Sequence, residues 1–276
     1  MSDDYGPRVS TGVQGLDEML KGGLIRGRPY VVSGTTGSGK TTLAIQYLHN
    51  GVKGGERSLL VAIDEPPVEI RENMRALGWD IGKIRILDAH PAAKAYTKRV
   101  SMVEVAAQRS VAPLREAGPS EKTEQLKKAA PEISIQSLQL MLRQELQETR
   151  YARLVIDSLT SLKKLSEMME DYNSSIMSLL RFLSEANVTT LILTDLPDPT
   201  ILEPEIFLCR GEIRLHKRMV GNRLDRWVTV EKFRGSAHDI MPRTMTITEK
   251  GITVDHKRKI PKASLKVLQA FTQFSR

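Results

Sequence analysis

The chain has 276 residues, enough for one large α/β domain or a domain with an appendage, and 40% of them are hydrophobic, so it can bury a sizeable core. Only 5% are aromatic, which argues against a platform that stacks nucleic-acid bases. A single cysteine, Cys209, excludes an internal disulfide and is typical of the reducing cytosol. We see no signal peptide and no long apolar run, so we expect a soluble cytoplasmic protein with no membrane contact.

The net charge of +8 is concentrated near the C-terminal end. Residues 256–276 carry six Lys or Arg and no acid, and we therefore divide the chain into a domain over 1–255 and a basic tail over 256–276. A second basic stretch lies in a helical insertion expected at about 91–132. The tail is a candidate for contact with nucleic acid, an acidic partner or a neighbouring subunit, and the insertion is a candidate for contact with nucleic acid. A solvated surface is the simpler interpretation of both segments.

The first half of the chain predicts alternating strands and helices. A short helix begins near Gln14 and ends at Gly22-Gly23. Apolar runs over 29–33, 58–63 and 83–87 are typical of buried parallel strands, and helices over 39–52 and 66–79 separate them. This order predicts βαβ units and a parallel sheet. Residues 91–132, rich in Ala, Lys, Gln and Glu and interrupted by prolines, predict a helical surface insertion.

The alternation resumes after the insertion. A helix over 133–149, a strand over 153–157, a helix through 176–183 and a strand over 189–194 follow one another. Beyond Pro197 the pattern changes, and segments 212–216 with 226–231 and 245–247 with 252–254 predict two β-hairpins. The predicted fold class is therefore α/β, with a mostly parallel central sheet flanked by helices and with C-terminal β-hairpins.

The strand over 29–33 runs directly into a glycine loop and then into a helix. The spacing of its glycines, lysine and threonine satisfies G-x-x-x-x-G-K-[ST], the P-loop pattern. Glycines let successive backbone N–H groups point at phosphate oxygens, and the helix N-terminus adds its own. Lys40 would reach the β- and γ-phosphates, and the Thr41 hydroxyl would bind Mg²⁺. The predicted nucleotide-binding residues are Gly34, Thr35, Thr36, Gly37, Ser38, Gly39, Lys40, Thr41 and Thr42.

Carboxylates follow two other predicted strands. Asp157 ends the strand over 153–157, where a partner acid is needed to hold Mg²⁺ opposite Thr41, here through a water. Asp64 and Glu65 follow the strand over 58–63 and share the edge of the P-loop, because the carboxyl ends of parallel strands lie together. A carboxylate there can polarise an attacking water, so both are candidate catalytic residues together with Lys40. A helix-start role before Pro66 is the simpler alternative.

Lys232 and Arg234 flank Phe233, and strand alternation puts both cations on one face. From the residues alone, this pair is either a solvated face or a source of positive charge for a γ-phosphate.

Together these segments resemble the KaiC-like branch of the RecA ATPase superfamily, and the resemblance covers nearly the whole chain. A single-domain chain of this kind looks most like the archaeal KaiC-like proteins. The resemblance implies a RecA-like P-loop NTPase fold with ATP and Mg²⁺ as cofactors. The matching segments are Ser10–Glu18, Gly22-Gly23, the P-loop, Asp64-Glu65, Leu77–Asp80, Val155–Ser158, Lys232–His238 and Ile247–Ile252.

The same resemblance implies a ring, expected to be a hexamer, with ATP bound between subunits. One subunit gives the P-loop. The next gives a Lys-x-Arg-Gly-Ser-x-His segment and a Thr-Glu pair that contacts the nucleoside. In this chain the residues expected to act from the neighbouring subunit are Lys232, Phe233, Arg234, Ser236, His238, Thr248 and Glu249.

Three departures from the family pattern bear on activity. Asp64 stands where a second glutamate is usual, so the choice of catalytic base between Asp64 and Glu65 stays open. The stretch 195–212 corresponds to the pore loop of DNA-handling relatives, but it is shorter than usual and rich in proline. The clock protein of this family carries a phosphorylated Ser-Thr pair, and this sequence has no evident counterpart of it. No residue is therefore assigned to an autokinase activity.

These observations favour an ATPase that turns over slowly and serves a regulatory role through a protein partner that the sequence does not name. Two alternatives stay open. A RecA paralogue that binds DNA in recombination or repair is favoured by the basic tail and insertion. A nucleotide-dependent scaffold that does not hydrolyse ATP is favoured by the aspartate at position 64.

Overall fold

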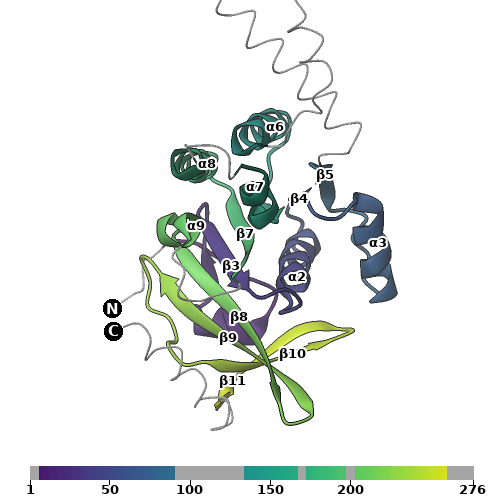
Figure 1. Ribbon diagram of the computed structural model, residues 1–276, viewed down its shortest axis with the longest axis vertical. Coiled ribbons are helices and arrows are strands. Elements are labelled where there is room, and N and C mark those ends of the chain that lie inside the picture. The colour runs from purple at the N-terminus through teal and green to yellow at the C-terminus, as the bar shows by residue number, and fades with distance from the viewer. Residues whose placement is uncertain (1–5, 91–133, 167–171, 197–202, 260–276) are drawn as a thin grey trace, which may run out of the picture.

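A nine-stranded sheet forms the centre of the molecule in the computed structural model, which describes residues 6–90, 134–166, 172–196 and 203–259 (Figure 1). The strand order is β11-β10-β9-β8-β3-β7-β6-β4-β5. The strands of this sheet are β3 (Pro29–Gly34), β4 (Ser58–Ala62), β5 (Arg85–Asp88), β6 (Arg153–Asp157), β7 (Thr189–Asp195), β8 (Gly211–Val220), β9 (Arg223–Phe233), β10 (Arg243–Thr248) and β11 (Gly251–Lys259). The helices are α1 (Gln14–Met19), α2 (Lys40–Lys53), α3 (Pro67–Ala76), α6 (Ile135–Glu148), α7 (Leu159–Ser166), α8 (Tyr172–Glu185) and α9 (Pro204–Leu208).

The sheet is parallel from β5 across to β8 and antiparallel from β8 to β11. β3 lies between β7 and β8, with Gly34 opposite both Asp195 and Leu215. This arrangement confirms the predicted fold class. It also brings the carboxyl ends of β3, β4, β6 and β7 to one edge of the sheet, where ligands of open α/β sheets bind.

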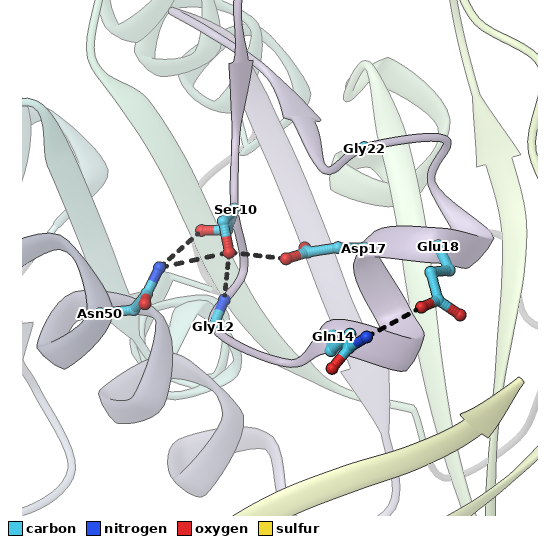
Figure 2. A pocket seen from close by; sticks show the side chains of 7 residues that line it. All are labelled: Ser10, Gly12, Gln14, Asp17, Glu18, Gly22 and Asn50. Atoms are coloured by element: carbon cyan, nitrogen blue, oxygen red, sulfur yellow. Dashed lines mark hydrogen bonds between the residues drawn. The ribbon is translucent and has the colours of Figure 1, made fainter. Parts of the chain in front are cut away.

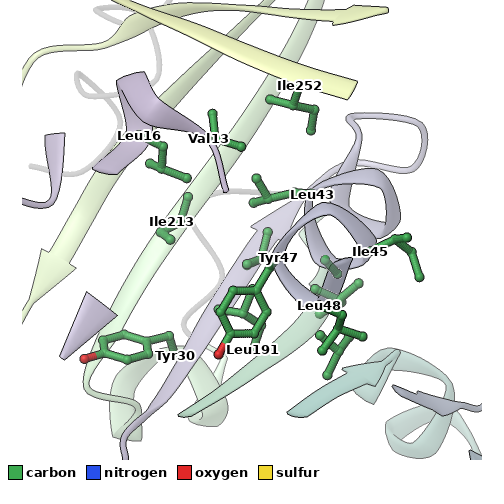
Figure 3. Close-up of a cluster of buried hydrophobic side chains, with 14 of the residues drawn as sticks. Val13, Leu16, Tyr30, Leu43, Ile45, Tyr47, Leu48, Leu191, Ile213 and Ile252 are labelled. Carbon is green, nitrogen blue, oxygen red and sulfur yellow. The ribbon is translucent and has the colours of Figure 1, made fainter. Parts of the chain in front are cut away.

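Two apolar layers hold helices on the two faces of the sheet. On one face α2 buries Leu43, Tyr47 and Leu48 against the strands, a spacing that follows the helical repeat (Figure 3). α1, α3 and the β10–β11 hairpin complete this layer. On the other face, α6, α7, α8 and α9 pack their apolar side chains against the sheet. The order α/β/α fixes α2, and therefore the loop before it, against the centre of the sheet.

The structure adds elements that the sequence pattern did not reveal. β1 (Arg8–Val9) and β2 (Leu24–Ile25) form a separate two-stranded sheet, and such short pairs carry too little periodicity to be recognised. α7 and α9 were also not predicted. β11 continues to Lys259, four residues past the boundary that we place at 255. The predicted insertion over 91–132 and residues 260–276 of the tail lie outside the described residues.

None of the helices in the part of the chain that the structure describes is long and apolar enough to span a membrane.

His216 is an unusual polar residue in the β8–β9 hairpin. Its ring stacks on Trp227 with the centroids 5.3 Å apart, and its Nε2 lies 2.8 Å from the Thr229 hydroxyl oxygen. Burial lowers the pKa of His216 to about 4. The folded protein therefore keeps this imidazole neutral at pH values where the unfolded chain protonates it.

We predict that His216 makes the folded state less stable in mild acid. Between the unfolded pKa of about 6.5 and the folded value, only the unfolded chain takes up the proton, so falling pH removes up to roughly 3 kcal/mol of the free energy of unfolding. His216→Gln lacks this contribution. Urea denaturation at about pH 7 and pH 5 should therefore show a smaller acid loss in the variant than in the wild type. Equal losses in the two proteins would contradict the prediction.

Candidate active site

The loop between β3 and α2 has three glycines with a positive φ, and at two of them an added Cβ atom would also clash with a neighbour. Gly34 and Gly39 have φ values of 152° and 111°, which favour glycine. A Cβ atom on Gly34 would lie 2.4 Å from the Leu215 carbonyl oxygen, and one on Gly39 would lie 2.6 Å from Ile247 Cδ1. Gly39 caps α2 without any side-chain hydrogen bond. The first N–H groups of α2 are therefore left for a ligand at the carboxyl edge of the sheet.

Lys40 is buried and its ammonium group is fully engaged. Nζ donates to the carbonyl oxygens of Gly34 at 2.9 Å and Thr35 at 3.2 Å, and it forms an ion pair with Asp195 Oδ1 at 2.7 Å. Asp195 ends β7, and its backbone N–H donates to the Thr160 hydroxyl. Our sequence prediction ended this strand at Thr194 and missed Asp195. The available signal was an acid at the end of a buried strand, the same signal that identified Asp157.

Thr41 and Asp157 meet as predicted. The Thr41 hydroxyl donates to Asp157 Oδ2 at 2.9 Å. Burial raises the pKa of Asp157 to about 6, the Thr41 hydroxyl lowers it, and the charges of Asp64 and Glu65 raise it further. The site thus holds a carboxylate whose negative charge is disfavoured by its surroundings.

Asp64 and Glu65 lie just beyond β4, on the same edge, but in different environments. Asp64 Oδ2 accepts a hydrogen bond from the Ser158 hydroxyl at 2.8 Å, so its carboxylate is tied to the residue that follows Asp157. Both residues are exposed, and the Glu65 carboxylate makes no hydrogen bond or ion pair with any residue that the structure describes. Both carboxylates are near enough to Asp157 for their charges to act on its pKa.

The remaining loop residues differ in exposure. Thr36 and Gly37 are exposed, whereas Thr35 and Thr42 are half-buried. Ser38 is fully buried, and its hydroxyl has no hydrogen-bond partner among the described residues. A buried hydroxyl without a partner is costly, and a ligand oxygen at the loop would satisfy it.

Lys232 and Arg234 lie at the opposite edge of the sheet from Lys40. The Arg234 N–H donates to the Arg210 carbonyl, and the Arg210 N–H donates to the carbonyl of Pro29, where β3 begins. The P-loop follows the other end of β3, so the length of a six-residue strand, on the order of 16–20 Å, separates the two sites along the sheet. Lys232 Nζ is bonded to the carbonyl oxygens of Ile206 and Phe207, and Arg234 Nη2 donates to that of Phe207 at 3.3 Å.

The other residues of this segment have structural contacts within the chain. Ser236 Oγ accepts a hydrogen bond from Arg8 at 2.8 Å, and the half-buried His238 ring packs edge-on against Phe233. Phe233 itself is 5% exposed and packs on Tyr30. Its side chain therefore belongs to the core of its own chain, and its expected contact with a neighbouring subunit stays a prediction.

The Thr248-Glu249 turn lies beside the P-loop of its own chain. Ile247, just before the turn, contacts Gly39, and the Trp79 indole N–H donates to the Glu249 carbonyl at 3.1 Å. Gln46 of α2 also binds the backbone N–H and the carbonyl of Ile252. This placement favours contact with a ligand in the same chain and gives no support to the expected action from a neighbour.

A hollow lined by the Ser10–Glu18 segment, shown in Figure 2, has a structural explanation. Asp17 accepts hydrogen bonds from the Ser10 hydroxyl at 2.6 Å and from the Thr11 hydroxyl and N–H at 2.7 Å. Asn50 of α2 donates to Ser10 (Figure 2). These groups satisfy one another and fasten the N-terminal segment to α2, so this hollow is a weaker candidate than the P-loop edge.

The model of the ATPase family described as KaiC matches residues 9–259, nearly all of the chain. The chain belongs to the KaiC ATPase family. The predicted resemblance is therefore confirmed.

Relatives of similar size support the single-domain type. A UPF0273 protein of Thermotoga maritima is 30% identical over 90% of this chain and 95% of its own length. A UPF0273 protein of Pyrococcus horikoshii is 31% identical over 90% of this chain and 93% of its own. The circadian clock oscillator protein KaiC of Parathermosynechococcus lividus is 29% identical, but the match spans only 42% of that longer protein. The solved structure of the KaiC-like protein PH0186 of Pyrococcus horikoshii superposes with a TM-score of 0.68 at 25% identity, covering 91% of this chain and 99% of that one.

We predict that Asp157→Asn stabilises this KaiC-family protein in the absence of metal and ligand. A carboxyl with a raised pKa costs stability wherever it is ionised in the folded state, so the wild type loses up to roughly 3 kcal/mol as pH rises from about 4 through 6. The amide has no such cost. Denaturation in a chelator should show the variant more stable near pH 7, with a difference that shrinks toward pH 4.

Asp88→Asn is the matched control. Asp88 ends β5 at the same sheet edge, and its Oδ1 accepts a hydrogen bond from the His90 N–H. The site interpretation requires that this change lack the pH-dependent gain of Asp157→Asn. The same gain in both variants would show that the edge as a whole, and not the Thr41–Asp157 pair, is responsible.

Proposed function

We propose that this protein binds ATP with Mg²⁺ at the P-loop and hydrolyses it slowly. The observation that carries the proposal is the meeting of Lys40, Thr41 and Asp157 at the carboxyl edge of the sheet. A lysine, a hydroxyl and a buried acid around a glycine loop and a helix N-terminus are the groups that recognise a polyphosphate with its metal ion. The unpaired Ser38 hydroxyl supports a ligand at the same place.

The residues present fit a magnesium ion. The Thr41 hydroxyl and the Asp157 carboxylate are hard oxygen ligands, and a cation beside them would offset the charge that raises the pKa of Asp157. Thr41 would hold the ion directly, and Asp157 through a water. When bound, the ion would neutralise charge on the phosphates.

Lys40 must exchange partners when a phosphate binds. Its three hydrogen-bond acceptors are now the Gly34 and Thr35 carbonyls and the Asp195 carboxylate. A phosphate oxygen that takes an ammonium proton displaces at least one of them. Asp195 is the acceptor whose charge resembles that of a phosphate, so it is the partner that a phosphate would most readily replace.

Glu65 is the better candidate for the catalytic base. Asp64 is held by Ser158, which leaves its carboxylate less free to accept a proton from water. Glu65, exposed like Asp64, has no such hydrogen bond among the described residues and carries the longer side chain. In this proposal Glu65 accepts the proton of the attacking water, and Asp64 positions Ser158 and the end of β6.

Lys232 and Arg234 are proposed to act on the site of a neighbouring subunit. Within one chain they lie at the edge opposite to the P-loop, and they can reach a nucleotide only across an interface between copies. A closed ring, expected to have six members, gives every P-loop such a neighbour. Ser236 and His238 would line the same interface, whereas Thr248 and Glu249 would contact the nucleoside of their own chain.

We propose a regulatory role for this ring, exercised through a protein partner. The alternative of a DNA-binding paralogue rests on the basic segments 91–132 and 256–276, which lie almost wholly outside the described residues, and no geometry favours it. A measurement of ATP turnover on the pure protein tests the alternative of a scaffold that does not hydrolyse ATP.

We predict that Glu65→Gln binds ATP as tightly as the wild type but loses at least about a hundredfold of its turnover rate, because an amide cannot accept the proton of water. The measurements are calorimetric ATP binding and phosphate release. Asp64→Asn is the comparison and should reduce turnover less. The reverse ranking would exchange the two roles, and full activity in both variants would remove these acids from the mechanism.

We predict that two inactive variants restore one another when mixed. Lys40→Ala removes the cation of the P-loop, and Arg234→Ala removes the cation offered to the neighbour. In a mixed ring some interfaces pair an intact P-loop with an intact arginine, so phosphate release should partly return. Labelled subunits are used to measure the exchange of subunits between rings. A mixture that exchanges subunits and stays inactive would contradict the shared site.

A further inference from the structure

Lys217 is a second lysine at the P-loop that belongs to no sequence motif. It lies on β8, two residues past Leu215, which is paired with Gly34 of β3. A Cβ atom on Gly37, in the middle of the loop, would lie 3.0 Å from Lys217 Nζ. The ammonium group is therefore in direct contact with the loop. It is exposed, and it makes no hydrogen bond or ion pair with any residue that the structure describes.

A second cation lies directly across from it. Arg226 of β9 is the antiparallel partner of Lys217, so both side chains extend from the same face of the hairpin. That face is the one that buries Leu215 and Val228 beneath α2. The Arg226 side chain is half-buried, and its Nε is inaccessible to solvent without a hydrogen-bond partner among the described residues.

This pairing is unfavourable unless an anion accompanies it. Like charges directly opposite on two strands destabilise a sheet, and a buried guanidinium N–H without an acceptor adds a further cost. An oxyanion between the loop and the hairpin would remove both costs at once. The two strands place both cations beside the position of a ligand bound at the P-loop.

The sheet order indicates which end of the ligand they would meet. Asp64, Asp157 and Asp195 follow β4, β6 and β7, all on one side of β3. β8 lies on the other side of β3. In the proposed function the metal ion and the attacking water lie beside these acids, at the end of the polyphosphate that reacts, so Lys217 and Arg226 lie toward the opposite end, where the phosphate chain joins the nucleoside.

We propose that Lys217, supported by Arg226, is a phosphate-binding residue of the same subunit, acting on the phosphate nearest the nucleoside. The inference deepens the proposed function and depends on it for the identity of the ligand. Lys40 lies within the loop, while Lys217 approaches it from the β8 side. The two lysines thus contact the polyphosphate from different directions, and Lys217 contributes to affinity for ADP as well as ATP.

The test compares Lys217→Gln with Arg218→Gln by calorimetry, using ATP, ADP and inorganic tripolyphosphate as probes. Arg218 is the next residue, exposed on the other face of β8, so its loss changes the net charge equally without touching the site. Because a charged contact is lost, the affinity for all three ligands is expected to fall by roughly tenfold in Lys217→Gln and to stay unchanged in Arg218→Gln. Lys217→Arg should bind as the wild type does, and without ligand no variant should melt at a lower temperature than the wild type.

The outcomes separate the inference from the proposed function. Wild-type ATP binding with unchanged affinity in Lys217→Gln overturns the inference and leaves the function standing. Equal losses in Lys217→Gln and Arg218→Gln also overturn it, because only long-range charge would then act. If Lys217→Gln loses affinity for ATP but not for ADP, the assignment to the phosphate nearest the nucleoside is overturned. A wild-type protein that binds neither ATP nor tripolyphosphate overturns both.

Discussion

The ion pair between Lys40 and Asp195 depends on two parallel strands that end side by side. β3 and β7 are neighbours in register, so Gly34 lies opposite Asp195 and the lysine that follows the loop can turn back onto the acid. Every other feature of the site uses the same edge: Asp157 ends β6, and Asp64 follows β4. Parallel strands gather their carboxyl ends in one place, and the βαβ connections supply the helix N-terminus that faces them.

The charged groups at this edge of the sheet lower the stability of the folded protein. The edge collects acids around one buried lysine, and burial, together with the charges of Asp64 and Glu65, raises the pKa of Asp157. The rest of the molecule provides the stability that the edge lacks, through apolar layers on both faces and through the contacts of Asp17 that fasten the N-terminal segment to α2. A stable frame with an uncompensated site is the general pattern of proteins that bind charged ligands.

The sequence was sufficient for the parts of the structure with a strong local pattern. The strands of the parallel sheet, α2 and the positions of Lys40, Thr41 and Asp157 could be predicted because buried strands are continuous apolar runs and the P-loop spacing is specific. Lys217 could not, because its role depends on which strands are neighbours of β3, and the strand order is also what makes the acid at the end of β7 the partner of Lys40. The core position of Phe233 was missed for a similar reason: its environment comes from Tyr30, far away in the sequence. The environments of Asp64 and Glu65 likewise needed the position of Ser158.

The short helix α9 connects the two edges of the subunit. Its buried Glu205 accepts a hydrogen bond from Thr194, whose hydroxyl lies 3.3 Å from that of Thr160, the residue that holds the backbone of Asp195. At its other end, the carbonyls of α9 hold Lys232 and Arg234. An unbroken line of contacts therefore runs from the partner of Lys40 to the cations on the far edge. In a ring this line would give each subunit a mechanical route for reporting the occupancy of its own loop to the next, so that successive sites need not behave as independent ones.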